Sequence, residues 1–225
     1  FLSLHSKIAL SLTAFLIFLG TVFILIFEYN NPYTLGGYTF FEKIMVALFQ
    51  SVTLRTAGFA SIAQECITDA SAFVSILLMF IGGSPAGTAG GIKTVTFFVL
   101  LVSTFSVIKN KRIVDVFNRQ ISTEILRRSV AVFAISLFTV IGSTILLIIF
   151  NGGEFIDILY ETVSATATVG LSRNYTSSLN TMGKIIITLT MYLGRVGPIS
   201  LAFAFSVNKS RENLIENPVE EISVG

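Results

Sequence analysis

Two long runs of apolar residues, at positions 8–27 and 130–150, dominate the hydropathy pattern of the chain. A helix needs about 20 mainly apolar residues to cross the hydrocarbon core of a bilayer, and both runs have that length. The first run is followed by Pro32, which disfavours helix at the residue before it, and the second by Asn151-Gly152-Gly153. Both runs therefore predict membrane-spanning helices.

Two further apolar stretches are interrupted by glycine. Residues 71–81 are apolar but too short to cross a bilayer, and a glycine-rich segment at 82–94 separates them from apolar residues 95–108. This pattern predicts one spanning path that is broken near its middle. Residues 185–207 are long enough to span, but Gly194-Arg195-Val196-Gly197-Pro198 lies within them.

A shorter segment lies within each half of the chain, at 40–54 and at 154–167, and each would cross about half a membrane at roughly 1.5 Å per helical residue. Each segment leads into a short cluster around one glycine, and Gly58 and Gly170 are 112 residues apart. We therefore predict an all-α integral membrane protein built from two repeats of span, re-entrant pore loop and span (M1-P-M2), as in potassium channels. The alternative is that these clusters are ordinary external turns.

Composition and charge support a bilayer as the solvent. Charged residues make up 12% of the chain and hydrophobic residues 53%, whereas soluble domains are about 25% charged. The net charge of +2 argues against nucleic acid as a partner. One cysteine, Cys66, and one histidine, His5, leave little material for disulfide, zinc or triad chemistry, so we do not expect an enzyme or a covalently bound cofactor.

Basic residues between the two halves orient the chain by the positive-inside rule, which places their loop in the cytoplasm. They are Lys109, Lys111, Arg112, Arg119, Arg127 and Arg128. We expect a first pore repeat at 1–110, a cytoplasmic linker at 111–128, a second pore repeat at 129–208 and a cytoplasmic tail at 209–225. Both glycine clusters then open toward the outside of the cell.

The two glycine clusters carry the expected ion chemistry. Non-helical backbone at membrane depth is tolerated only where it is buried in protein or lines water. Backbone carbonyls can replace the hydration shell of a monovalent cation, and glycine can turn its carbonyl where other residues cannot. The C-terminal ends of the half-helices add partial negative charge. We therefore expect a potassium filter, with looser selectivity than a two-glycine TVGYG filter, at Thr56, Ala57, Gly58, Phe59, Thr168, Val169, Gly170 and Leu171.

The glycine-rich break and one arginine are the candidates for a gate beneath this filter. Arg195 lies in an apolar span, where charge is costly and usually functional; a snorkelling or packing arginine is the alternative. For the break, a structural kink is the alternative, and Lys93 near its inner end can also be explained by snorkelling. We expect Arg55 to support the first filter loop by pairing with Glu161 or Glu42. The break comprises Gly82, Gly83, Ser84, Pro85, Ala86, Gly87, Thr88, Ala89, Gly90 and Gly91.

These motifs resemble the KtrB/TrkH/HKT superfamily of potassium transporters, and most closely its KtrB subunits. The matching motifs are Arg55-Thr56-Ala57-Gly58-Phe59, the glycine-rich break with Ile92-Lys93-Thr94, Thr168-Val169-Gly170-Leu171-Ser172 and Gly194-Arg195-Val196-Gly197-Pro198. The resemblance implies that the motif residues form a filter and a gate, and that K+ is the transported ion and Na+ a coupling or activating ion.

The resemblance also implies the surroundings of the chain. Members have four span-pore-span repeats around one pore, so this chain would supply the third and fourth. They form homodimers in the bacterial plasma membrane, in contact with lipid and with a cytoplasmic ring of nucleotide-binding (RCK-type) regulatory subunits. Two alternatives stay open, a TrkH-type potassium transporter subunit and a non-conducting membrane scaffold.

Overall fold

The computed structural model describes residues 3–85, 89–110, 115–116 and 119–197. Two long helices, α1 (Leu4–Glu28) and α5 (Thr123–Phe150), are long and apolar enough to cross a membrane. Each begins at a serine, Ser3 or Ser122, whose hydroxyl accepts a hydrogen bond from a backbone N–H of the first turn. They contain the two uninterrupted apolar runs at 8–27 and 130–150 and begin four and seven residues before them.

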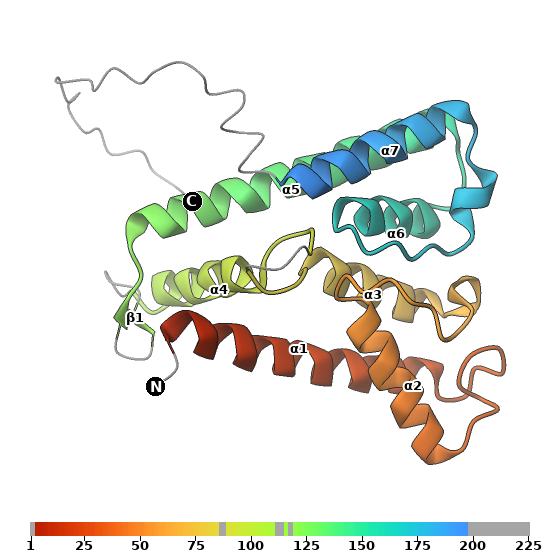
Figure 1. The fold of residues 1–225 in the computed structure, drawn as a ribbon, viewed down its shortest axis with the longest axis horizontal. Coiled ribbons are helices and arrows are strands. Elements are labelled where there is room, and N and C mark those ends of the chain that lie inside the picture. The colour runs from red at the N-terminus through yellow and green to blue at the C-terminus, as the bar shows by residue number, and fades with distance from the viewer. Residues whose placement is uncertain (1–2, 86–88, 111–114, 117–118, 198–225) are drawn as a thin grey trace.

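The broken apolar stretch forms two shorter helices, α3 (Asp69–Phe80) and α4 (Thr94–Ile108). They follow one another along nearly the same line, with the loop of the break between them (Figure 1). Thr68 caps α3 by accepting from the N–H of Ser71. The helix is therefore interrupted where the sequence predicts it, between Phe80 and Thr94, and the crossing of a membrane by the α3–α4 pair stays a prediction.

Two short helices precede the glycine clusters, α2 (Phe40–Thr53) and α6 (Phe155–Thr166). Figure 1 shows α2 crossing α1 at an angle, while α6 lies beside α7 (Thr181–Val196). The apolar stretch expected at 185–207 thus begins earlier, at Thr181, and its helix ends before Gly197, which has a positive φ of 85°. Residues 198–207 lie outside the described part of the chain.

Two short 3-10 helices and two short strands lie in the segments between the helices. The 3-10 helices η1 (Gln64–Cys66) and η2 (Tyr175–Ser178) follow the two glycine clusters. Between α4 and α5, the strands β1 (Asp115–Val116) and β2 (Arg119–Gln120) pair antiparallel as a short hairpin. This hairpin lies in the region expected to be a basic linker.

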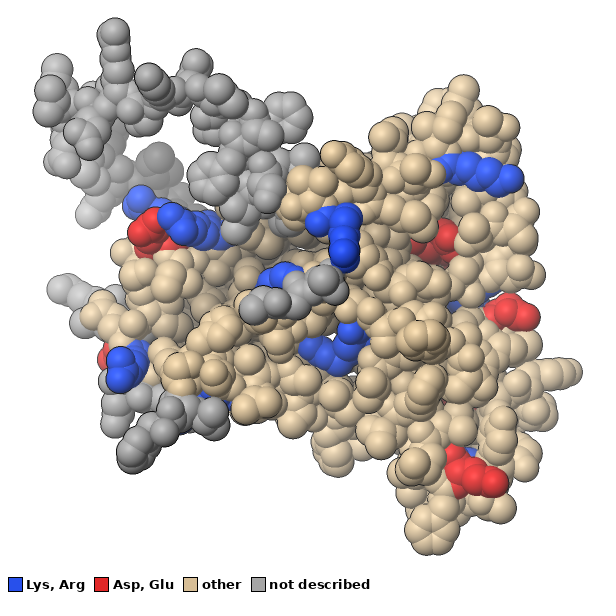
Figure 2. All heavy atoms as spheres, viewed as in Figure 1, with Lys and Arg blue, Asp and Glu red and all other residues tan. Residues whose placement is uncertain are grey.

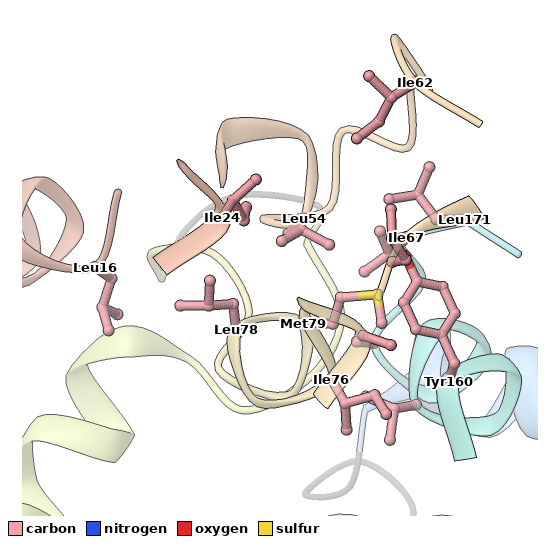
Figure 3. Close-up of a cluster of buried hydrophobic side chains, with 14 of the residues drawn as sticks. Leu16, Ile24, Leu54, Ile62, Ile67, Ile76, Leu78, Met79, Tyr160 and Leu171 are labelled. Atoms are coloured by element: carbon pink, nitrogen blue, oxygen red, sulfur yellow. The ribbon is translucent and has the colours of Figure 1, made fainter. Parts of the chain in front are cut away.

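A buried apolar cluster joins the two halves of the chain. Its members come from α1, α2, α3, α5 and α6 and from the loops next to them. Figure 3 shows Tyr160 of α6 beside Met79 of α3, with Ile67 and Leu171 near the far end of its ring. Tyr160 and Met79 are both 0% exposed. Packing between α3 and α6 therefore fixes the position of the second glycine cluster against the first half.

The outer faces of the helices are also apolar. Phe18 of α1 is 68% exposed and Phe138 of α5 is 74% exposed. Figure 2 shows a largely uncharged surface, with charged side chains toward its two ends and a few basic ones near its middle. Exposed apolar surface of this extent marks contact with membrane or protein rather than with water.

Candidate functional site

The two glycine clusters have the same unusual backbone. Thr56 and Gly58 have φ angles of +70° and +78°, and Thr168 and Gly170 have φ angles of +56° and +87°, whereas Ala57 and Val169 between them lie outside the positive-φ region. Alternation of this kind gathers the N–H groups on one side of a chain, which leaves the carbonyls on the other. A β-branched residue at positive φ is rare and costs on the order of 1–3 kcal/mol, and such strain concentrates at functional sites.

The two loops touch one another. A Cβ built on Gly58 would lie only 2.2 Å from the carbonyl oxygen of Val169. This contact means that the backbone of the first cluster packs directly against a carbonyl of the second. Segments separated by more than 100 residues are thus brought to one place, as a single filter formed by both clusters would require.

The first loop is held by the end of its own helix. The Thr53 hydroxyl donates to the carbonyl of Phe59 at 2.7 Å and accepts from the Phe59 N–H at the same distance. The N–H groups of Ala57 and Gly58 donate to the Thr53 carbonyl at 3.1 and 3.2 Å. Thr53 therefore holds the loop through Gly58 itself and through the residues before and after it.

The second loop is held by a carboxylate. Glu161 of α6 is 4% exposed and accepts from the hydroxyls of Ser172 at 2.6 Å and Thr176 at 2.5 Å. Both hydroxyls belong to the segment that leaves the loop. Since hydrogen bonds to an ionised group are the stronger kind, this contact anchors the segment behind Gly170.

The predicted pairing of Arg55 with a carboxylate is wrong. Its Nη2 donates to the carbonyl of Gly82 at 2.8 Å. Glu161 binds the two hydroxyls described above, and Glu42 accepts from the N–H and hydroxyl of Thr39, both at 2.8 Å, in a capping box at the opposite end of α2. Arg55 follows the C-terminal end of that helix, so the length of α2 separates it from Glu42. Arg55 therefore links the first loop to the start of the break.

Backbone hydrogen bonds hold the two ends of the break together. The N–H of Ile92 donates to the Phe80 carbonyl at 3.1 Å, and the N–H of Thr94 donates to the Gly83 carbonyl at 3.2 Å. An isolated parallel bridge joins Ile81 to Ile92. These bonds hold the end of α3 next to the start of α4.

The far side of the break lies against the second loop. The N–H of Gly90 donates to the Thr168 hydroxyl at 3.0 Å, and a Cβ on Gly90 would lie 2.6 Å from both that hydroxyl and the Ala167 carbonyl. The Ser84 hydroxyl lies 3.3 Å from that of Thr13 in α1. Three other expected gate residues, Ala86, Gly87 and Thr88, lie outside the described residues.

Two basic residues lie near the break. Lys93 donates from Nζ to the Ala89 carbonyl. Arg195 lies in the last turn of α7, and its charge interacts with that of Lys93. Its neighbour Gly194 packs so closely on α6 that a Cβ would lie 2.1 Å from the Thr166 carbonyl. That Arg195 acts together with the break stays a prediction.

Two contacts that reasoning from sequence missed also join the halves. Arg173, two residues after the second cluster, lies 3.2 Å from the Asp69 carboxylate and 3.3 Å from that of Asp157. Tyr160 donates from its hydroxyl to Gln64 at 3.0 Å. A charge beside the loop was the available signal for Arg173, whereas Tyr160 does not stand out in α6, which also carries Asp157 and Glu161.

Comparison with known proteins identifies relatives along the whole chain. The family described as cation transport protein, TrkH, matches residues 2–216. Ktr system potassium uptake protein B of Bacillus subtilis (strain 168) is 38% identical over 223 residues, covering 99% of this chain and 50% of that protein. The Ktr system potassium uptake protein B of Vibrio alginolyticus is 34% identical, covering 100% of this chain and 49% of that protein.

A third relative, potassium/sodium uptake protein NtpJ of Enterococcus hirae, is 36% identical, covering 100% of this chain and 51% of that protein. The chain therefore spans about half the length of these curated relatives. The crystal structure of the potassium transporter TrkH from Vibrio parahaemolyticus shares its fold, with a TM-score of 0.72 over 88% of this chain and 43% of that one, at 17% identity. The chain belongs to the TrkH family of cation transport proteins, which are membrane transporters and not enzymes.

Proposed function

We propose that this chain supplies two span-pore-span repeats of a potassium uptake pathway, with the two glycine clusters as parts of one filter. The observation that carries the proposal is the matched backbone of the clusters, with positive φ at Thr56 and Gly58 and again at Thr168 and Gly170. The contact between Gly58 and the Val169 carbonyl supports one shared pathway. In this arrangement α1, α2 and the α3–α4 pair form one repeat, and α5, α6 and α7 the other.

Potassium is the ion that a filter of backbone carbonyls favours. Carbonyl oxygens can take the place of water around a dehydrated monovalent cation, and the C-terminal ends of α2 and α6 add partial negative charge beside them. Glu161, an acidic residue near the second loop, already accepts hydrogen bonds from two hydroxyls, so the carbonyls are left as the ligands for the ion. Three similar proteins carry potassium in their names, and one of them also carries sodium, which supports Na+ as a coupling or activating ion.

The break between α3 and α4 is proposed as the gate. Its hydrogen bond from Gly90 to Thr168 and its bond from Arg55 to Gly82 connect it to both filter loops. The positive charges of Lys93 and Arg195 near it would raise the barrier to a passing cation. Opening would then require the break and these charges to move relative to the filter.

The whole protein extends beyond what this chain supplies. Because the chain spans half of its relatives, we propose that two further repeats complete the filter. A homodimer in the bacterial plasma membrane, with the hairpin side and the C-terminal tail in the cytoplasm beside an RCK-type regulatory ring, is the assembly that the family resemblance implies. The unit boundaries at 110, 128 and 208 remain those of the sequence-based proposal.

Uptake by the full-length protein that carries this chain tests the proposal. Expressed in bacteria that lack their own potassium uptake, it should restore growth at low external K+, and the purified protein should take up rubidium into liposomes. A charge reversal of Glu161 to lysine should abolish both, because it removes the anchor of the second loop. Membrane-inserted wild-type protein that gives neither growth nor flux would favour the non-conducting scaffold.

A further inference from the structure

A small polar network lies buried behind the two glycine loops. Gln50 of α2, Gln64 of η1 and Tyr160 of α6 are 1%, 4% and 0% exposed. Gln50 donates from Nε2 to Oε1 of Gln64 at 2.8 Å, and Gln64 donates back from Nε2 to Oε1 of Gln50 at 3.2 Å. Gln64 also donates to the Ile62 carbonyl at 3.0 Å and accepts from the Tyr160 hydroxyl at 3.0 Å.

The amide of Gln64 is fully used by these partners. A glutamine side chain offers two donors and a carbonyl oxygen with two lone pairs, and all four are engaged here. In an apolar environment such a network is rigid when complete, and it becomes costly when one partner is removed. The network therefore fixes one geometry rather than several.

The three side chains are placed to set the spacing of the loops. Gln50 lies six residues before Thr56, Gln64 six residues after Gly58, and Tyr160 eight residues before Thr168. Figure 3 shows the Tyr160 ring among apolar side chains of the first half. The network thus connects both ends of the first loop to the helix that carries the second loop.

We propose that Gln50, Gln64 and Tyr160 form a positioning network that sets the distance between the two loops and thereby the discrimination of K+ from Na+. The inference rests on the proposed function. Selectivity in carbonyl filters depends on the size of the cage or on the number and strength of its dipoles. Both change when one loop moves relative to the other, because the Val169 carbonyl packs on Gly58. None of the three side chains needs to touch the ion.

The substitution Tyr160→Phe tests this inference in the full-length protein. It keeps the ring in the apolar cluster and removes the hydroxyl that reaches Gln64. The readout is the ratio of the inhibition constant for sodium to the apparent KM for rubidium in uptake assays, which does not depend on the amount of folded protein. We expect the discrimination against sodium to fall roughly threefold, with about tenfold as the upper limit for one neutral hydrogen bond.

Tyr175→Phe is the matched control. The Tyr175 hydroxyl donates to the Gly152 carbonyl at 2.6 Å and accepts from Asn151 at 3.1 Å, so a tyrosine hydroxyl is again lost, but at the outer end of α5. Partial burial raises the pKa of Tyr175 above its ordinary value, so this hydroxyl is protonated at neutral pH in the wild type. The control should keep the wild-type ratio.

A fall in the ratio for Tyr160→Phe alone supports the network. An unchanged ratio, or an equal fall in both variants, overturns it while leaving the proposed function intact. If Tyr160→Phe does not insert into the membrane, Gln50→Met removes the other partner of Gln64 at similar side-chain length and should cause the same loss of discrimination. Wild-type protein without rubidium uptake would overturn the proposed function and this inference together.

Discussion

Alanine at Gly58 and at Gly170 should have unequal effects on transport, although both glycines have a positive φ. Left-handed backbone costs an L-residue roughly 1–2 kcal/mol, and this cost is common to both variants. At Gly170 an added Cβ meets no described atom within 4 Å, whereas at Gly58 it would lie 2.2 Å from the Val169 carbonyl oxygen.

The contact at Gly58 determines how far uptake by Gly58→Ala should fall below uptake by Gly170→Ala. Real Cβ contacts are essentially never below 3.0 Å, so Gly58→Ala must move one loop by about 0.8 Å in a site as densely packed as a protein core. Because the displaced atom is a carbonyl of the proposed filter, we expect rubidium uptake by Gly58→Ala to be at least about tenfold below that of Gly170→Ala, an extra cost of about 1.4 kcal/mol in the barrier.

The assay is initial rubidium uptake by the full-length protein in liposomes, normalised to inserted protein. Gly142→Ala in α5, where an added Cβ also meets nothing within 4 Å, serves as a neutral control and should transport like the wild type. Equal uptake by Gly58→Ala and Gly170→Ala would refute the reasoning, because the contact between the loops would then have no bearing on conduction.

Other substitutions test the supports of the loops and the gate. Thr53→Val removes both bonds to Phe59 and should lower the free energy of unfolding by about 1–3 kcal/mol, measured as a lower Tm, whereas Thr104→Val, which loses one bond to its own helix, should change it little. Glu161→Gln should lower Tm by weakening two charge-assisted bonds, each by about 1 kcal/mol, and an unchanged Tm would contradict that role. Arg195→Ala should raise potassium flux, and unaltered flux would remove the support for its place in the gate.

The local elements could be predicted from sequence because each depends on nearby residues. Apolar runs located α1 and α5, and the interruption at 82–94 separated α3 from α4. The short helices α2 and α6 were predicted to within one residue at each end. Hydropathy, glycine and proline act over a few residues, so they are visible in the sequence itself.

The contacts between distant residues could not be predicted in the same way. Arg55 had two carboxylates as plausible partners but binds the Gly82 carbonyl, because backbone oxygens freed by the break are closer than either acid. The Tyr160–Gln64 bond joins residues 96 positions apart. A single sequence carries no signal for such a pair until the packing of α3 against α6 is known.

The position of bound ions tests the central claim most directly. A structure of the full-length protein with rubidium or thallium, solved with anomalous data, should show ion density beside the carbonyls of residues 56–58 and 168–170. Density at that point would place the ion between the two loops, as their matched backbone predicts. Strong ion density elsewhere in the membrane region, with none beside these carbonyls, would contradict the claim that the two glycine clusters form a filter.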